Sequence, residues 1–352
     1  MKTYQKVYIA IDLHANTSTI GYMDQEGKYI AQHQVQTSAM NLVNHIVAIP
    51  AEYKMLTIEQ GNMTFSMAEQ LQDYVHELIV CDPRHNALIH SGENKTDKLD
   101  TMHLCTLLRL GSVKQVWRPK GMGTRRVFFD QVKTYQRRVK TLSKYKRQFT
   151  DSLRHWGINR KVTRTDYKHS QRLIECMENS LYKDELLEKL RFIEQLEVAK
   201  EKAKQRFIKT GKEFWEIPEF MKIPGVGPIG AHRFSGYIQT PYRFRRAGQL
   251  IKYCSLSIRK FTSDGRKVRS ERLSKAGHGC LKGLAHTAWT TAMGSDNEVS
   301  RYYQDCLEQG GDEVHARLST ERKILVTMWA LWKNEEPYDS KKFTYKYGDS
   351  TR

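Results

Sequence analysis

The chain has 352 residues, a formal net charge of +19 and a sequence pI near 9.6. One hydrophobic core rarely organises a chain of this length, so we expect two or three domains. The positive charge indicates a polyanionic partner, because basic surfaces attract nucleic acid by releasing its condensed counterions. The six cysteines are scattered and form no CxxC pair, which argues against a disulfide framework and against a zinc ribbon.

The charge is unevenly distributed along the chain. Residues 1–100 hold 7 Lys and Arg against 12 Asp and Glu, so the remaining residues hold 51 against 27. We therefore expect catalysis in the acidic part and nucleic-acid binding in the basic part. The first residues lack the continuous apolar stretch and cleavage site of a signal peptide, and no apolar run is long enough to span a bilayer. These features predict a soluble, intracellular protein.

Residues 1 to about 115 alternate predicted strands and helices. The segments VYIAID, STIGYMD and KYIAQHQVQ are typical of three strands joined by short turns. A helix from Ser38 to Ile49, a strand ending at Glu59, a helix from about Phe65 to Tyr74 and the short strand ELIVCDP follow. Further helical segments are expected around His85 and Asp97. A three-strand meander followed by helix-separated strands predicts an α/β domain of the RNase H-like, or RuvC-like, kind.

Four carboxylates in this segment form a candidate metal site. Asp12 and Glu59 each end a predicted strand, and Asp97 and Asp100 share one face at the opening of a helix. Magnesium prefers oxygen ligands, and two such ions about 4 Å apart stabilise both oxygens of an in-line displacement at phosphorus. Taken singly, Asp12 is typical of a turn cap, Glu59 of a solvated surface acid, and the Asp97 and Asp100 pair of a helix N-terminus. Together they predict a metal-dependent phosphodiester enzyme.

Two long helices are expected next. Apolar residues from Thr124 to Trp156 follow steps of three, four or seven, with Lys146 the only break. Residues 101–165 contain 17 Lys and Arg against two acids, Asp130 and Asp151, which favours a helix that faces nucleic acid. A second helix, roughly Leu181 to Lys209, balances Glu and Lys around its apolar positions. The two helices form an antiparallel hairpin or dimerise, and the sequence does not distinguish these alternatives.

The third segment begins near Trp215. Its turn PGVGP, with Gly225 and Gly227, resembles a helix-hairpin-helix element, in which backbone N–H groups at a helix start hold a DNA phosphate. A plain glycine turn between two helices is the equally weighted alternative. A basic and aromatic stretch follows and suits phosphate contact better than core burial. In that stretch His278, Cys280 and His286 lack a fourth metal ligand at a sensible spacing, so we interpret them as packing residues.

Several of these motifs, in this order, resemble one known family. The segments IAID, TIEQGN, NKTDKLD, IPGVGPIGA and SLSIRKFTSDGRKVRSERLSKAGHGCLK are similar to those of the insertion-sequence one-ten family of transposases, also called bridge recombinases. The resemblance runs from about Tyr8 to His286, and the NKTDKLD and RLSKAGH blocks are its most specific pieces. It implies a RuvC-like DEDD domain over residues 1–115, a basic coiled-coil or helical hairpin over 116–214, and a mainly α-helical, serine-bearing transposase domain over 215–352.

The resemblance also assigns roles to residues. It implies that Asp12, Glu59, Asp97 and Asp100 bind magnesium, or manganese in its place, and that Ser263 in KFTSDG is the catalytic nucleophile. This chain departs from the family around the serine. Ser255, Leu256, Ser257 and Ile258 replace the usual Gly-Leu-Thr/Ala-Pro, and Asp264 replaces the glycine after the serine. Thr262, Ser257 and Ser270 are weaker candidates for the nucleophile.

The partners that the resemblance implies are target DNA, donor DNA and a noncoding bridge RNA encoded by the element. It further implies a dimer or tetramer on DNA, in which the serine domain of one subunit completes the metal site of another, and a prokaryotic, cytoplasmic protein associated with the nucleoid. Two alternatives stay open: a site-specific DNA invertase that needs no RNA, and a catalytically silent nucleic-acid-binding relative. The predicted nucleic-acid contacts are Arg125, Arg126, Arg137, Arg138, Gly225, Gly227, Arg259, Lys260, Lys267, Arg269, Arg272 and Lys275.

Overall fold

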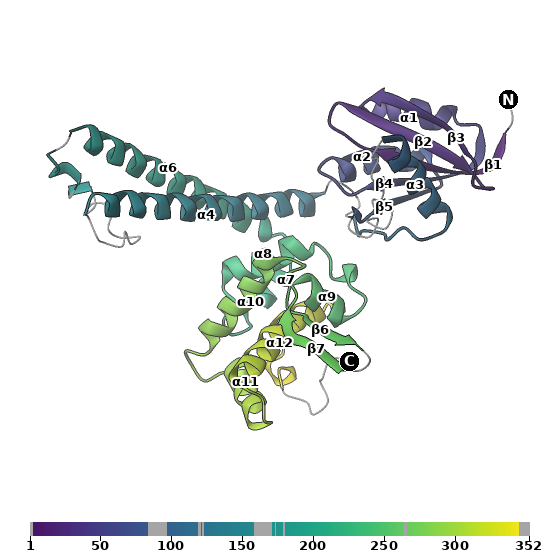
Figure 1. The fold of residues 1–352 in the computed structure, drawn as a ribbon. Helices are drawn as coiled ribbons and strands as arrows, with labels where there is room; N and C mark the ends of the chain where they lie inside the picture. Colours follow the sequence, from purple (N-terminus) through teal and green to yellow (C-terminus); the bar gives the residue numbers. More distant parts are fainter. Residues whose placement is uncertain are drawn as a thin grey trace. The chain divides into compact units, whose positions relative to one another are not determined.

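The structure, a computed structural model, forms two compact units, Met1–Gly121 and Met122–Arg352 (Figure 1). It describes residues 3–83, 97–118, 121, 123–157, 171–172, 174–178, 180–263 and 266–344. Within these ranges, the side chains of residues 97–98, 180, 260–263 and 266–271 are outside the description. The sequence predictions for the helical segment around His85 and for Asp264 lie outside the described residues.

The N-terminal unit is built on a five-stranded mixed sheet with the order β3-β2-β1-β4-β5. The first three strands pair antiparallel, as the predicted meander requires, whereas β1 pairs parallel with β4 and β4 pairs parallel with β5. The predicted α/β architecture is therefore confirmed. The strands are β1 (Tyr4–Asp12), β2 (Thr17–Asp24), β3 (Tyr29–Gln36), β4 (Ala51–Glu59) and β5 (Glu77–Cys81).

Helices cover both faces of this sheet (Figure 1). Alternate residues of β1, such as Ile9 and Ile11, join one core with helices α1 (Ala39–Ala48) and α2 (Thr64–Leu71). Ala10 points to the opposite face, where α3 (Asp97–Arg109) packs. Burial on both faces explains why the central strand is a continuous apolar run rather than an alternating one. The predicted N-terminus of α1 is confirmed, because the Ser38 side chain accepts a hydrogen bond from the Asn41 N–H at 3.1 Å.

The C-terminal unit begins with two 32-residue helices, α4 (Thr124–His155) and α6 (Ser180–Gly211). They pack antiparallel within the chain, since Tyr135 meets Phe207 at one end and Trp156 meets Tyr182 at the other. The structure thus shows the predicted antiparallel hairpin, whereas dimerisation through these helices stays a prediction. Most of the predicted apolar seam of α4 is buried: Phe128, Val132, Tyr135, Leu142, Phe149 and Leu153.

Lys146, the only break in that seam, is accommodated by an ion pair. Its Nζ lies 2.5 Å from Oε1 of Glu197 on α6, and both side chains are largely shielded from solvent. The polar position therefore bonds across the helix pair instead of leaving a charge uncompensated.

Shorter helices build the rest of the C-terminal unit around α12 (Figure 1). They are α7 (Glu216–Met221), α8 (Pro228–Ile238), α9 (Ala247–Tyr253), α10 (Gly279–Ala292), α11 (Glu298–Glu308) and α12 (Glu313–Asn334). This confirms the predicted mainly α-helical region. The long helix α4 joins the same core, because its Phe128 and Val132 pack against Gly236 of α8. None of the helices that the structure describes is both long enough and apolar enough to cross a membrane.

One element of this unit was not anticipated by the sequence analysis. Strands β6 (Ile258–Ser263) and β7 (Arg266–Leu273) form an antiparallel hairpin within the basic stretch. Its cross-strand pairs include Arg259 with Arg272 and Thr262 with Lys267. Such a polar alternation lacks the apolar face by which strands are usually recognised in sequence, which explains why it was missed.

Candidate functional site

The first two predicted metal ligands lie at one edge of the N-terminal sheet. Strands β1 and β4 run parallel with Ile11 opposite Ile58, so the next residues, Asp12 and Glu59, end neighbouring strands at the same level. Asp12 is one-fifth exposed, and its Oδ2 lies 3.1 Å from Nε2 of His14. The carboxyl ends of parallel strands thus bring the two acids together, as the sequence predicted.

Helix α3 directs its first turn toward the same edge. Near its end, the Arg109 guanidinium lies beside Gly27, in the turn that links β2 to β3 at the far end of β1. About one helical turn earlier, Cys105 packs against Ala10 and donates through Sγ to the Gly21 carbonyl at 3.5 Å. The helix therefore runs antiparallel to β1, and Asp100 lies toward the Asp12 end.

The chemistry of this edge fits a hard dication. Asp12, Glu59 and Asp100 offer only oxygen donors, which magnesium prefers. Among the residues whose side chains are described, no three His, Cys, Asp or Glu converge closely enough to hold a metal ion in this conformation. The Asp97 carboxylate is outside that set. The structure thus brings the backbone positions to one edge, whereas metal binding by the four acids stays a prediction.

The predicted nucleophile lies in the other unit, on the β6–β7 hairpin. Ser263 is the last residue of β6 and pairs with Arg266, the first residue of β7, so it stands at the end of the hairpin where the two strands are closest in sequence. The weaker candidates Thr262 and Ser270 lie on the same two strands, and Ser257 precedes β6, where its carbonyl accepts from the Ser274 N–H at 2.8 Å. A turn-proximal position is the one that the resemblance implies for the nucleophile.

The base of this hairpin is held by hydrogen bonds to the helical core. Arg322 of α12 donates through Nε and Nη2 to the Leu256 carbonyl, at 3.0 and 2.8 Å. On the other side, the backbone N–H of His278 donates to the Tyr253 carbonyl at 2.6 Å. Gly277 has φ +129°, and a Cβ there would lie 2.7 Å from the Lys252 and Tyr253 carbonyls. The two ends of the hairpin are therefore fixed to the helical core.

A neutral histidine sits in this base among cations. The His278 ring lies 4.0 Å from the Tyr237 ring, and burial together with Arg233, Arg243 and Lys140 lowers its pKa to about 4. Its Nδ1 has no hydrogen-bond partner among the described residues. The predicted packing role of His278 agrees with this placement.

His286 differs from His278, because it is more than half exposed and its Nδ1 lies 2.9 Å from Oε1 of Glu321. The packing role predicted for His286 is therefore wrong, because its imidazole contacts the buried Glu321 carboxylate and stays more than half exposed. Together with Cys280, these histidines form no metal-binding group among the described residues.

Two of the predicted nucleic-acid contacts are engaged inside the protein. Arg125 pairs through Nη1 with the fully buried Glu216 at 2.6 Å, and its guanidinium stacks 3.6 Å from the centroid of the Phe214 ring. Arg138 donates to the Ala199 carbonyl and so links α4 to α6. Both arginines have structural partners that the sequence pattern could not reveal. Contact with nucleic acid stays untested for them.

The two glycines of the PGVGP turn have different surroundings. Gly225 has φ +84°, and a Cβ there would lie 1.9 Å from the Ala288 carbonyl oxygen of α10. Gly227 caps α8 with φ −79°, and nothing lies within 4 Å of a Cβ built on it. Close packing therefore accounts for Gly225, whereas Gly227 is open at the start of a helix, as a phosphate contact requires.

The remaining predicted contacts lie mainly on the surface. Arg137, Arg259, Arg272 and Lys275 are exposed, and Arg126 is half-buried. The side chains of Lys260, Lys267 and Arg269 are outside the description, although their backbones belong to the hairpin. Exposure of this kind is compatible with phosphate binding.

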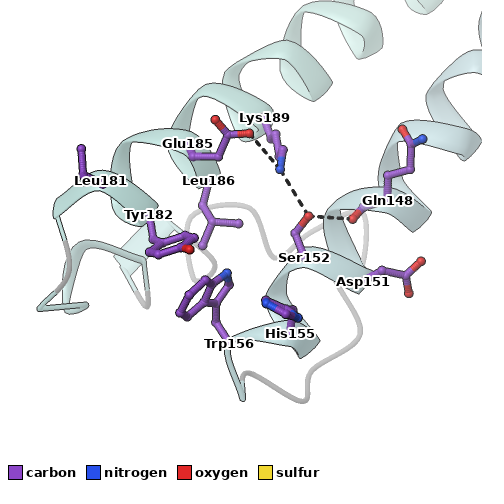
Figure 2. Close-up of a pocket in the computed structure, with 10 residues that line it drawn as sticks. All are labelled: Gln148, Asp151, Ser152, His155, Trp156, Leu181, Tyr182, Glu185, Leu186 and Lys189. Atoms are coloured by element: carbon purple, nitrogen blue, oxygen red, sulfur yellow. Dashed lines mark hydrogen bonds and ion pairs between the residues drawn. The ribbon is translucent and has the colours of Figure 1, made fainter.

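A separate hollow of about 760 Å³ lies at the distal end of the α4–α6 pair (Figure 2). The Trp156 and Tyr182 rings face one another in it, and Lys189 pairs with Glu185 at 3.0 Å and reaches Ser152 at 3.4 Å. Its lining mixes both charge signs, and none of the predicted catalytic residues belongs to it. The hollow therefore adds nothing to the predicted active site.

The comparison with protein families agrees with the sequence motifs. Residues 218–304, from α7 to α11, match the model of the transposase IS116/IS110/IS902 family. This confirms the family predicted from the sequence and supports a DNA transposase or recombinase. The matched segment includes the hairpin with Ser263. No curated protein matches the chain.

Proposed function

We propose that this chain, of which residues 218–304 match the transposase family model, cuts and rejoins DNA strands with Ser263 as the nucleophile and a carboxylate-bound dication as its cofactor. The observation that carries the proposal is the position of Ser263 at the end of a cationic hairpin where the two strands are closest in sequence, inside the matched segment. Arg and Lys residues share these two strands with Ser263, and such cations suit the phosphates next to the reacting one.

The reaction that follows is a transesterification at phosphorus. The Ser263 Oγ–P bond forms while the P–O bond to the leaving deoxyribose oxygen breaks, the serine hydroxyl loses its proton, and the leaving oxygen gains one. Rejoining reverses these steps, with a hydroxyl of another DNA strand as the attacking group. Bond energy is conserved in the phosphoserine, so no high-energy co-reactant is required.

The dication would be held by Asp12, Glu59, Asp97 and Asp100. When bound, such an ion stabilises charge on the attacking and leaving oxygens. The ends of β1 and β4 are suitable supports for two of these ligands, because a paired sheet restricts their movement. Ser263 and the carboxylates belong to different units, so catalysis requires that folding or subunit assembly bring them together.

The proposal extends to a guide RNA and to assembly on DNA. We expect a structured noncoding RNA to pair with target and donor DNA, and a dimer or tetramer to form the complete active sites. Sequencing of the nucleic acid that copurifies with the protein tests the first point. A single defined RNA supports guided recombination, whereas its absence from an active preparation favours the RNA-independent invertase.

The serine assignment is tested with Ser263→Ala. The variant should lose the covalent protein–DNA adduct that survives denaturation, yet bind DNA as the parent protein does. Thr262→Ala, one position away on β6, is the matched control and should keep the adduct. An adduct that persists in Ser263→Ala but disappears in Thr262→Ala would transfer the nucleophile to Thr262.

A further inference from the structure

The outer face of α4 carries an uninterrupted row of five cations. Lys133, Arg137, Lys140, Lys144 and Arg147 follow one another in steps of four, three, four and three residues, and all five are exposed. At about 100° per residue, these steps keep the five side chains within a sector of about 80°. We call this row the α4 stripe.

The α4 stripe lies opposite the buried seam of the same helix. Leu142 and Phe149 are buried against α6, and the helical period places them about 180° from the centre of the stripe. Because packing against α6 fixes the rotation of α4, the stripe is directed away from α6. The packing of α4 against α6 therefore places the five cations on one surface.

The cations of the stripe are not neutralised by the protein. Across the part of the chain that the structure describes, no carboxylate forms an ion pair with any of the five. The row ends where Asp151 occupies the next position on this face and lies 3.4 Å from Arg154. A row of like charges costs stability through mutual repulsion, so its presence indicates a polyanionic ligand.

Helix α6 provides the contrast within the same hairpin. Its cations alternate with acids, and Lys189 pairs with Glu185 at 3.0 Å and Lys204 with Glu201 at 3.1 Å. The two helices have the same length and share one interface. Exposed cations that form no ion pair among the described residues extend over fifteen residues of α4, from Lys133 to Arg147, but on α6 their uninterrupted row is limited to Lys202, Arg206 and Lys209. A requirement for solubility does not explain this difference in charge pattern, because it applies equally to both helices.

The dimensions of the stripe suit a nucleic-acid backbone. The fourteen steps from Lys133 to Arg147, at about 1.5 Å each, span about 21 Å. Over that length a DNA duplex presents roughly a dozen phosphates, because it carries one charge per about 1.7 Å of axis. Five lysine and arginine side chains on flexible stems can each reach one of them.

The part of the α4 stripe from Lys133 to Lys140 also lies near the base of the hairpin that carries Ser263. Lys140 acts electrostatically on His278, which follows β7 and stacks on Tyr237. Phe129, one turn before Lys133, packs edge-on against the same Tyr237 at 6.0 Å. A backbone that lies on the stripe is therefore led toward the base of the hairpin.

We infer that the α4 stripe binds the phosphodiester backbone of a double-stranded nucleic acid and guides it toward the β6–β7 hairpin. This deepens the proposed function and rests on it for the identity of the partner. The shared chemistry is the phosphate row, and its source is duplex DNA or a duplex arm of RNA. Because the contacts are to phosphates, binding through the stripe is independent of base sequence.

The test compares two triple variants of the full chain. Lys140→Gln, Lys144→Gln and Arg147→Gln remove three charges from the stripe. Arg191→Gln, Lys202→Gln and Lys209→Gln remove three charges of the same kinds from exposed positions of α6. Affinity for a 30-base-pair DNA duplex and for an RNA duplex of equal length is measured by fluorescence anisotropy over a series of potassium chloride concentrations.

For the stripe variant we expect the slope of log Kd against log salt to fall by about 3, one for each phosphate that the variant no longer neutralises, with at least a tenfold weaker affinity at low salt. The α6 variant should change the slope by less than 1. A weakening confined to one duplex identifies DNA or RNA as the source. Equal slopes for the two variants on both duplexes overturn the inference.

Two further measurements separate the possible causes. The charge-keeping variant Lys140→Arg, Lys144→Arg and Arg147→Lys should bind as the parent does, which distinguishes loss of charge from loss of fold. Adduct formation by the parent protein is measured in parallel. If the parent protein binds through the stripe but forms no adduct, the proposed function is contradicted and the inference about the stripe stands. If the parent protein forms the adduct but the stripe variant binds as the parent does, the inference about the stripe is contradicted and the proposed function stands.

Discussion

The two units of this chain place their proposed catalytic groups by different means. In the N-terminal unit, Asp12 and Glu59 are fixed at the ends of paired parallel strands and supported by buried helices. In the C-terminal unit, Ser263 stands at the far end of a two-stranded hairpin that is attached to a helical core at its base. Metal ligands require fixed separations, whereas a nucleophile that meets a long substrate benefits from projecting toward it.

The largest expected effect tests the rigid half of this comparison. Asp12→Asn keeps the size of the side chain but removes its charge, so a magnesium-dependent reaction should lose at least about 100-fold in the rate of strand cleavage. Cleavage of a labelled DNA duplex at saturating magnesium measures this rate. Glu52→Gln, an exposed acid at the start of β4, is the control and should be silent.

An Asp12→Asn protein that cleaves at the parent rate would remove the N-terminal carboxylates from the mechanism. The sheet would then be a binding platform, and the catalytically silent or metal-independent alternatives would gain support. Manganese in place of magnesium should restore little activity to Asp12→Asn, because either ion then meets a neutral amide oxygen instead of a carboxylate.

The second effect concerns the attachment of α4 to the C-terminal core. Arg125→Met leaves the buried Glu216 carboxylate without its cation, and among the described residues the Ser235 hydroxyl, 2.6 Å away, is the donor that remains. We expect the free energy of unfolding of this unit to fall by about 3 kcal/mol, as for other broken buried pairs. Urea titration followed by circular dichroism measures the decrease.

Arg126→Met, at the neighbouring half-buried position, should cost less than about 1 kcal/mol. If Arg125→Met were as stable as Arg126→Met but bound DNA more weakly, the sequence prediction of Arg125 as a nucleic-acid contact would be correct. Its ion pair with Glu216 would then be a resting arrangement.

The third prediction separates the two glycines of the PGVGP turn. Gly225→Ala forces a Cβ against the Ala288 carbonyl and strains a positive φ, so it should destabilise the unit by more than about 2 kcal/mol. Gly227→Ala meets no atom and has a negative φ, so stability should change by less than about 1 kcal/mol. Thermal unfolding ranks the two.

The same pair of variants tests the helix-hairpin-helix interpretation. A folded Gly227→Ala protein with weakened DNA affinity supports a phosphate at the start of α8, since the added methyl group would obstruct it. Unchanged affinity leaves PGVGP as a plain glycine turn.

The units also differ in how well sequence predicts them. The first follows from alternating and continuous apolar runs, and the predicted strand ends at Asp12 and Glu59 are those observed. The two long helices were predicted equally well from their apolar spacing. Their pairing within one chain was not distinguished from dimerisation, because it depends on contacts such as that of Lys146 with Glu197, which no local sequence pattern encodes. The β6–β7 hairpin was not predicted from the sequence, because its cationic strands lack a regular alternation of apolar residues.

The predicted contacts show the same limit at the level of single residues. The sequence of a basic helix does not distinguish an arginine that faces solvent, as Arg137 does, from one that pairs with a buried carboxylate, as Arg125 does. Tertiary partners far along the chain decide between the two roles. Charge composition therefore predicted a nucleic-acid-facing helix but only partly its residues.

The smallest expected effect concerns the base of the hairpin and its dependence on pH. Burial and nearby cations lower the pKa of His278 to about 4, against 6.5 in an unfolded chain. As the pH falls from 6.5 to 4, His278 binds a proton in the unfolded chain but stays neutral in the folded protein. The free energy of unfolding therefore declines between pH 6.5 and pH 4 and is highest above pH 6.5. The share of His278 should be about 2 kcal/mol, a figure reduced from the full pKa difference because solvent partly screens the ring.

Urea titrations of the parent and of His278→Gln at pH 7 and at pH 4.5 measure this share. The parent should lose more stability between the two pH values than the variant does. Burial also lowers the pKa of His232, so the variant should retain a weaker dependence of the same sign. Equal decreases in the two proteins would mean that His278 is protonated in the folded state. The hairpin base would then be open to solvent or to an anion that offsets Arg233, Arg243 and Lys140, and its support of Ser263 would depend on that ligand rather than on packing alone.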